Sequence, residues 1–238
     1  MSAQTTQTSS LRDSYTEKLL RGQDDLLLGI LEGDARSALR QIGRMLTISL
    51  PCLAAYGGTM GLYQGGWQIL STIGKVPALL YGTLLASFPV LHVFNVLVGS
   101  RVGFVRTFAL TLTAVTTTSI LLGAFAPISF VFNVRSRPGD YAFLQLFHVS
   151  VFAVAGVFGG LAMYRALCLV CEKSDIYPRT GLRLLKVWIL VFGFVGIQVA
   201  WSLRPFVGDP VLPPEGLRDE QYETVYTHLI RLPGELGE

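Results

Sequence analysis

The chain has 238 residues, of which 51% are hydrophobic and 15% are charged. Soluble domains carry roughly 25% charged residues, and here the charges are clustered so that long stretches hold none. A charge near the middle of a bilayer costs on the order of 3 kcal/mol or more, so such stretches are typical of membrane-spanning helices. The net charge of +3, without a basic run, favours no nucleic-acid partner. We therefore expect an all-α, polytopic membrane protein.

Residues 1–44 are predicted to form a cytoplasmic leader. Its first ten residues are polar and favour disorder. Apolar residues then recur at roughly helical spacing between charged ones, which predicts an amphipathic N-terminal helix leading into the first span: Leu27, Leu28, Leu31, Ala35, Leu39 and Ile42. This helix would cover the bundle from the cytoplasm or lie on the membrane surface. No signal peptide precedes the first span, which we expect to act as an uncleaved anchor.

Five nearly uncharged segments follow, each compared with the ~20 residues that cross a bilayer. Gly65-Gly66 is predicted to end the first span, with a short interfacial piece around Trp67 and Lys75 in the first loop. Prolines at 77, 89 and 127 are expected to kink the second and third spans. The expected spans are residues 45–64, 76–98, 107–132, 141–164 and 187–203.

The connections differ in their content of Lys and Arg. Six precede the first span and five lie in the loop before the last, so a cytoplasmic amino terminus places 13 inside and 6 outside. The positive-inside rule favours this orientation, and five spans then put residues 204–238, an acidic tail, outside. We thus expect a leader (1–44), a membrane domain (45–203) and an external tail (204–238).

Small residues spaced by four are the strongest pattern within the spans. Gly57, Gly61 and Gly65 fall on one helix face, as do the pairs Gly82/Ala86, Gly156/Gly160 and Gly196/Ala200. Such faces let helix backbones approach closely. The pattern predicts a tightly packed five-helix bundle. The sharper alternative is that Gly57, Gly61 and Gly65 form a homo-oligomer contact.

Two histidines fall within spans, where a pair of imidazoles can bind a metal or relay protons. His92 lies past the middle of its span and His148 before the middle of its own, so their depths differ by roughly 13 Å. We therefore predict no metal site and interpret both as packing histidines. Cys168 and Cys171 form a C-x-x-C without further ligands nearby, and are interpreted as inert thiols or an acylation site rather than a redox couple or half of a zinc site.

No Asp or Glu occurs in any expected span, which argues against an ion-coupled transporter. A run of hydroxyl residues from Thr111 to Ser119 would bond to its own backbone or line a path for a neutral solute. The chain shows no nucleophile with its base, phosphate-binding loop or carboxylate pair. We therefore predict no enzyme, no catalytic residue and no cofactor.

Three runs resemble a family of uncharacterised bacterial multi-pass inner-membrane proteins, over roughly residues 70–210: PVLHVFNVLVGS (89–100), AFAPISF (124–130) and GIQVAWSLRPFVG (196–208). The layout is more distantly similar to the Yip1 family of trafficking-associated membrane proteins. The first resemblance implies a bacterial inner (plasma) membrane and brings no known activity. Trp201 and Arg204 are interpreted as an anchor at the outer boundary, or as a contact for a periplasmic partner or lipid headgroup.

The sequence thus favours a non-enzymatic membrane scaffold or assembly subunit, with an unidentified membrane or periplasmic protein partner. The alternative is a small-solute channel or passive transporter subunit, whose pathway the Thr-rich third span would line.

Overall fold

The computed structural model describes residues 23–97, 99, 102–137, 140–173, 179–203, 206 and 207, with the backbone alone at 23–25, 166, 167, 169–173 and 179–185. Its regular elements are six helices: α2 (Gln23–Glu32), α3 (Ala35–Met60), α4 (Trp67–Leu97), α5 (Phe104–Arg135), α6 (Tyr141–Lys173) and α7 (Arg179–Leu203). The described part of the chain contains no strand. The prediction of an all-α bundle is confirmed.

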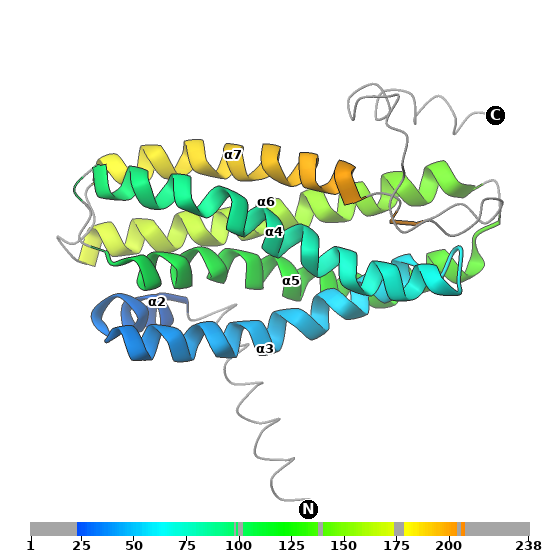
Figure 1. The fold of residues 1–238 in the computed structure, drawn as a ribbon, viewed down its shortest axis with the longest axis horizontal. Coiled ribbons are helices and arrows are strands. Elements are labelled where there is room, and N and C mark those ends of the chain that lie inside the picture. The colour runs from blue at the N-terminus through cyan, green and yellow to red at the C-terminus, as the bar shows by residue number, and fades with distance from the viewer. Residues whose placement is uncertain are drawn as a thin grey trace, which may run out of the picture.

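The five long helices run up and down along one common axis (Figure 1). α3, α5 and α7 point one way, and α4 and α6 return between them. Neighbours form a ring in the order α3, α4, α7, α6, α5, and the parallel pair α3 and α5 shares the most extensive contact. α7 ends well short of the end where α6 begins (Figure 1).

Four helices are long and apolar enough to cross a membrane: Trp67–Leu97, Phe104–Arg135, Tyr141–Arg165 and Lys186–Leu203. They correspond to the second to fifth expected spans. α3 is the remaining long helix, and three arginines occupy its first half. Only Met45–Met60 is free of charge, a length of about 24 Å. This short stretch explains why α3 has the weakest apolar signal of the five long helices.

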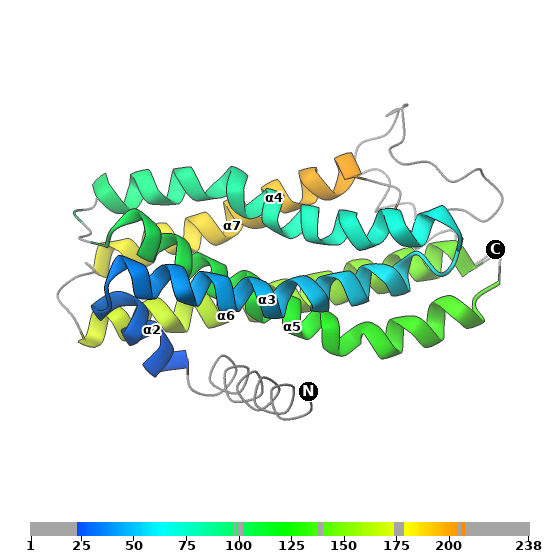
Figure 2. The ribbon, with the colours of Figure 1, turned by 60° about the horizontal axis from the view of Figure 1, so that its bottom comes forward.

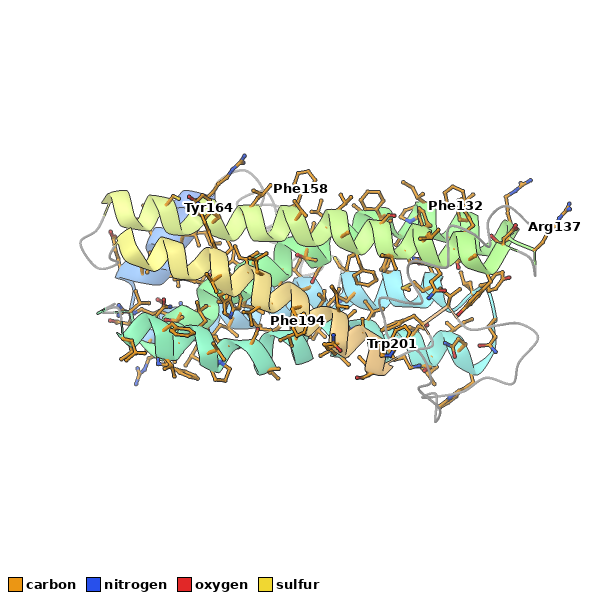
Figure 3. The ribbon with its side chains drawn as sticks, turned by 90° about the horizontal axis from the view of Figure 1, so that it is seen from above. Phe132, Arg137, Phe158, Tyr164, Phe194 and Trp201 are labelled. Carbon is orange, nitrogen blue, oxygen red and sulfur yellow. The ribbon has the colours of Figure 1, made fainter. Side chains whose placement is uncertain are left out.

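The membrane helices expose large apolar side chains around the outside of the bundle. Leu85 on α4, Val157 on α6 and Leu190 on α7 are 62%, 62% and 75% exposed. Phe132 and Phe158 point away from the bundle in Figure 3. Such an apolar surface is unfavourable in water, but it is well suited to contact with the hydrocarbon chains of a membrane. The chain is therefore a multi-pass membrane protein.

The short helix α2 packs under one end of the bundle, against α3, α5 and α6 (Figure 2). Leu26, Leu27, Ile30 and Leu31 on its apolar face are all buried. This is the covering arrangement of the two expected from the sequence. The predicted helix is broken at Gly33, where a Cβ atom would lie 2.5 Å from the Gly29 carbonyl oxygen. α3 then continues without interruption through position 44, so the leader and the membrane domain share a helix.

The connection between α3 and α4 differs from the expectation in detail. The predicted break at Gly65-Gly66 is confirmed, and both glycines have positive φ, at 76° and 54°. However, α3 ends at Met60, and Trp67 begins α4 rather than a separate interfacial piece. Lys75, expected in the first loop, lies two turns inside α4 and is only 8% exposed. Its long apolar stem makes this possible, because a lysine can bury its methylenes beside a helix.

Close helix packing explains several glycines. A Cβ atom at Gly57 would clash with the Thr72 carbonyl oxygen, and one at Gly61 would lie 2.6 Å from Ile69 Cα. Both glycines therefore let α3 approach the start of α4 in the same chain. The face predicted as an alternative homo-oligomer contact is thus occupied by α4, while Gly65 lies in the turn that follows.

Candidate functional site

The most distinctive polar feature of the interior is a buried cluster where α3, α5 and α6 meet. We call Tyr56, Thr59, Ser129, Asn133 and His148 the polar cluster. The Tyr56 hydroxyl lies 2.8 Å from His148 Nδ1, and the Asn133 side-chain nitrogen lies 3.2 Å from His148 Nε2. Tyr56, Asn133 and His148 are 0%, 2% and 2% exposed. Polar groups removed from water in this way are stable only when they bond to each other.

The polar cluster joins each pair of its three helices once. Tyr56 and His148 join α3 to α6, and His148 and Asn133 join α6 to α5. The Thr59 and Ser129 hydroxyls, 2.8 Å apart, join α3 to α5. Hydrogen bonds between membrane helices contribute about 0.6 kcal/mol each on average. Their arrangement as a closed triangle fixes the relative height of three helices at one position.

The surrounding bonds determine which ring nitrogen of His148 carries the proton. Asn133 Nδ2 donates to the Ser129 carbonyl oxygen at 2.8 Å, which orients the amide. Its other hydrogen faces the Ser129 hydroxyl and His148 Nε2, each 3.2 Å away, and the bond to Nε2 assigns the tautomer in which that nitrogen is unprotonated. The proton resides on Nδ1, which donates to the Tyr56 hydroxyl. In this arrangement a neutral imidazole satisfies both of its nitrogens inside the protein.

Aromatic rings enclose the cluster on its apolar side. The Tyr56 ring meets those of His148 and Phe152 edge to face, each at a centroid separation of 5.6 Å. Toward the end of the bundle, Tyr63 donates to the Arg137 carbonyl oxygen and packs near Tyr141. Phe152 thus packs directly against the cluster, whereas Tyr63 and Tyr141 lie beyond it toward the end of the bundle.

One acceptor of the cluster is left over. Asn133 Oδ1 is buried and has no hydrogen-bond partner among the described residues. An unpaired buried acceptor costs roughly 1–3 kcal/mol. A single donor, such as one water molecule, would satisfy it. The groups present are weak acids and bases held in a network.

The cluster lies near one boundary of the apolar zone. At the opposite end, Lys186 Nζ sits 5.2 Å from the centre of the Tyr164 ring, a pairing typical of a membrane interface. His148 is about 24 Å from Tyr164 along α6, while a hydrocarbon core is about 30 Å thick. The polar cluster is therefore just inside the far boundary, close to the end marked by Arg137 in Figure 3.

The structure separates the two membrane histidines far more than the sequence indicated. His92 packs on Phe104 at the start of α5, whereas His148 bonds to Asn133 near the end of α5. These positions are roughly 40 Å apart along that helix. His92 stacks on Phe88 at a centroid separation of 6.0 Å, as expected of a packing histidine. No group of three possible metal ligands occurs among the described residues.

The Thr-rich run is buried inside the bundle, and its hydroxyls bond to their own helix. Each donates to the carbonyl oxygen four residues earlier, at 2.7–3.2 Å, as seen for Thr111, Thr113, Thr116, Thr117, Thr118 and Ser119. Each of these hydroxyls donates its only hydrogen to the backbone. Thr118 also lies 3.3 Å from the Ala155 carbonyl oxygen of α6, so it contributes to the helix contact.

The remaining residues of interest are spread over the molecule. Cys168 is a half-buried free thiol on α6, and Cys171 is described by its backbone alone. Trp201 is half-buried near the end of α7, and Arg204 falls outside the described residues (Figure 3).

Sequence reasoning singled out only His148 of the polar cluster. Asn133 fell one residue beyond the expected end of the third span, in a loop, where an amide needs no partner. α5 in fact continues to Arg135. Nothing in the sequence indicated Tyr56 and Thr59, because they come close to His148 only when the three helices pack together. A polar residue placed just past a span end is the one clue that the sequence offered.

Comparison with known proteins gives no relative: no protein-family model, curated protein or solved structure matches this chain.

Proposed function

We propose that this protein is a non-enzymatic membrane scaffold or assembly subunit. The observation that carries the proposal is the use of polar groups inside the bundle. The buried hydroxyls of α5 bond to their own backbone, and the polar cluster joins three helices to each other. Both arrangements stabilise one packing of the helices. Neither leaves a row of free polar groups along which a solute could move.

The location and orientation are part of the proposal. The resemblance of three sequence runs favours a bacterial inner membrane, and the distribution of Lys and Arg favours a cytoplasmic amino terminus. In this orientation α3 is the first of five spans. α2 then covers the cytoplasmic end, and the end of α3 at Met60 and the end of α5 at Arg135 face outward with the polar cluster beneath them. Cytoplasmic and periplasmic partners would each meet one end of the bundle.

Site-specific photo-crosslinking in the native membrane tests the scaffold directly. A photoreactive amino acid at Val157 or Leu190 faces the lipid side, while the same group at Leu122, which is 0% exposed, serves as the buried control. We expect the exposed positions to give a reproducible protein adduct and Leu122 to give none. A complete absence of protein adducts at several exposed positions, including adducts to a second copy, would overturn the proposal.

A small-solute channel is the second candidate, favoured by the concentration of buried hydroxyls on α5 and by the unpartnered Asn133 Oδ1. Flux into liposomes containing the purified chain distinguishes the two. The scaffold predicts no flux above that of empty liposomes. Flux that is lost in the variant T113V/T116V/T117V would favour the channel instead.

A further inference from the structure

Three arginines lie on one exposed face at the start of α3. Arg36, Arg40 and Arg44 follow each other at intervals of four residues, and each step turns the helix by about 40°. All three side chains are exposed. Among the described residues, neither Arg36 nor Arg40 has a hydrogen-bond or ion-pair partner. Three positive charges thus form a ladder along one side of the helix, which we call the arginine ladder.

The arginine ladder coincides in depth with the headgroup layer of a membrane. The uncharged part of α3 begins at Met45, directly after Arg44, so Arg44 marks the boundary of the hydrocarbon core. Arg40 and Arg36 are then roughly 6 and 12 Å farther out. The headgroup layer extends about 5–8 Å beyond the core. Arg44 and Arg40 therefore lie within this layer, and the backbone of Arg36 lies roughly 4 Å beyond it, a distance that an arginine side chain can span.

The same face of α3 becomes apolar where the ladder ends. Thr47, Leu50 and Pro51 continue it into the hydrocarbon zone, all three are exposed, and the Thr47 hydroxyl is already bonded to the Arg44 carbonyl oxygen at 2.8 Å. A molecule lying along this face would meet guanidinium groups at one end and apolar side chains at the other. This order, from positively charged to apolar side chains, matches a phospholipid with an anionic headgroup and apolar acyl chains.

We propose that the arginine ladder binds the phosphate of an anionic phospholipid whose acyl chains lie along α3. Guanidinium groups recognise phosphate through paired hydrogen bonds, and each basic residue near a membrane surface contributes to the attraction for anionic lipids. Phosphatidylcholine carries the same phosphate beside a positive choline, so it is the matched neutral lipid. The ladder does not require a scaffold role, but its depth rests on the proposed crossing of the membrane by α3.

Native mass spectrometry of the full chain in detergent, with equal amounts of phosphatidylglycerol and phosphatidylcholine, tests the ladder. We expect the wild-type chain to prefer phosphatidylglycerol, and R36Q/R40Q to reduce this preference by on the order of tenfold. The variant R135Q/R137Q removes two exposed arginines at the other end of the bundle and is the matched control. It should change the preference by less than about twofold. R36K/R40K should retain most of it.

Two outcomes would overturn the ladder. One is an unchanged preference for phosphatidylglycerol in R36Q/R40Q when its elution from size-exclusion chromatography matches that of the wild type. The other is displacement of the lipid by millimolar inorganic phosphate, which would identify a site for a free anion. If R36Q/R40Q fails to elute as a folded species, the single variants R36Q and R40Q are measured instead, and each should lose part of the preference.

Discussion

At the residue scale, the polar cluster shows how a few side chains determine the packing of a bundle in lipid. Hydrocarbon provides little drive for apolar helices to associate, so specific polar contacts and close approach decide which faces meet. His148 is the centre of the cluster because a neutral imidazole donates and accepts at once. Tyr56 and Asn133 use these two properties from different helices.

Removing one hydroxyl from the cluster should have a measurable but moderate cost. Tyr56→Phe keeps the ring contacts with His148 and Phe152 and leaves His148 Nδ1 without its partner. We expect a loss of about 1 kcal/mol in the free energy of unfolding. Tyr164→Phe is the control, because its hydroxyl has no hydrogen bond to a described residue. Unfolding in mixed micelles measures both, and equal stability of the two variants would contradict a structural role for the Tyr56 bond.

At the element scale, the sequence predicted the spanning helices well and their ends less well. Long uncharged runs show where α4, α5, α6 and α7 cross, because a charge in hydrocarbon is costly. The ends are less certain because a helix continues beyond the core until a turn stops it. Lys75 and Asn133 were assigned to loops for this reason. The polar cluster could not be predicted, since its members are brought together by the register of three separate helices.

Gly156 and Gly159, about one turn apart on α6, should respond differently to substitution by alanine. At Gly159 a Cβ atom would lie 2.9 Å from the Ala114 carbonyl oxygen and would also meet the Thr118 hydroxyl. At Gly156 nothing lies within 4 Å. We expect Gly159→Ala to cost about 1–3 kcal/mol and Gly156→Ala to cost none. Thermal unfolding of the two variants measures this, and an equal response would mean that α5 and α6 are not in close contact.

One hydrogen bond between α2 and the bundle can be removed by a single substitution. Arg106 at the start of α5 donates to the Leu31 carbonyl oxygen at 2.9 Å, in the last turn of α2, where an unsatisfied carbonyl favours a positive charge. We expect Arg106→Gln to increase amide hydrogen exchange in α2 about tenfold, since a charged hydrogen bond contributes about 1.5 kcal/mol. Exchange within α6 should not change. Unaltered exchange in α2 would show that its apolar face alone holds it.

At the scale of the whole molecule, the five long helices expose apolar side chains on the outside of the bundle. Inside it, hydrogen bonds between polar side chains join three of them. α3 has the shortest uncharged stretch, yet it packs extensively against α5 and α4. A helix shielded by its neighbours needs less apolar surface of its own, because only part of it contacts lipid. We therefore propose that α3 crosses the membrane with the other four, so that the start of α3 and the end of α7 lie on opposite sides.

Cysteine accessibility on the two sides of α3 tests this crossing most directly. In a cysteine-free chain, Ser37→Cys precedes the membrane part of α3 and Gln64→Cys follows it. We predict that a membrane-impermeant maleimide labels Gln64→Cys on intact cells, and labels Ser37→Cys only after the membrane is opened. Labelling of both positions from the same side would contradict the five-span bundle, because α3 would then lie beside the membrane without crossing it.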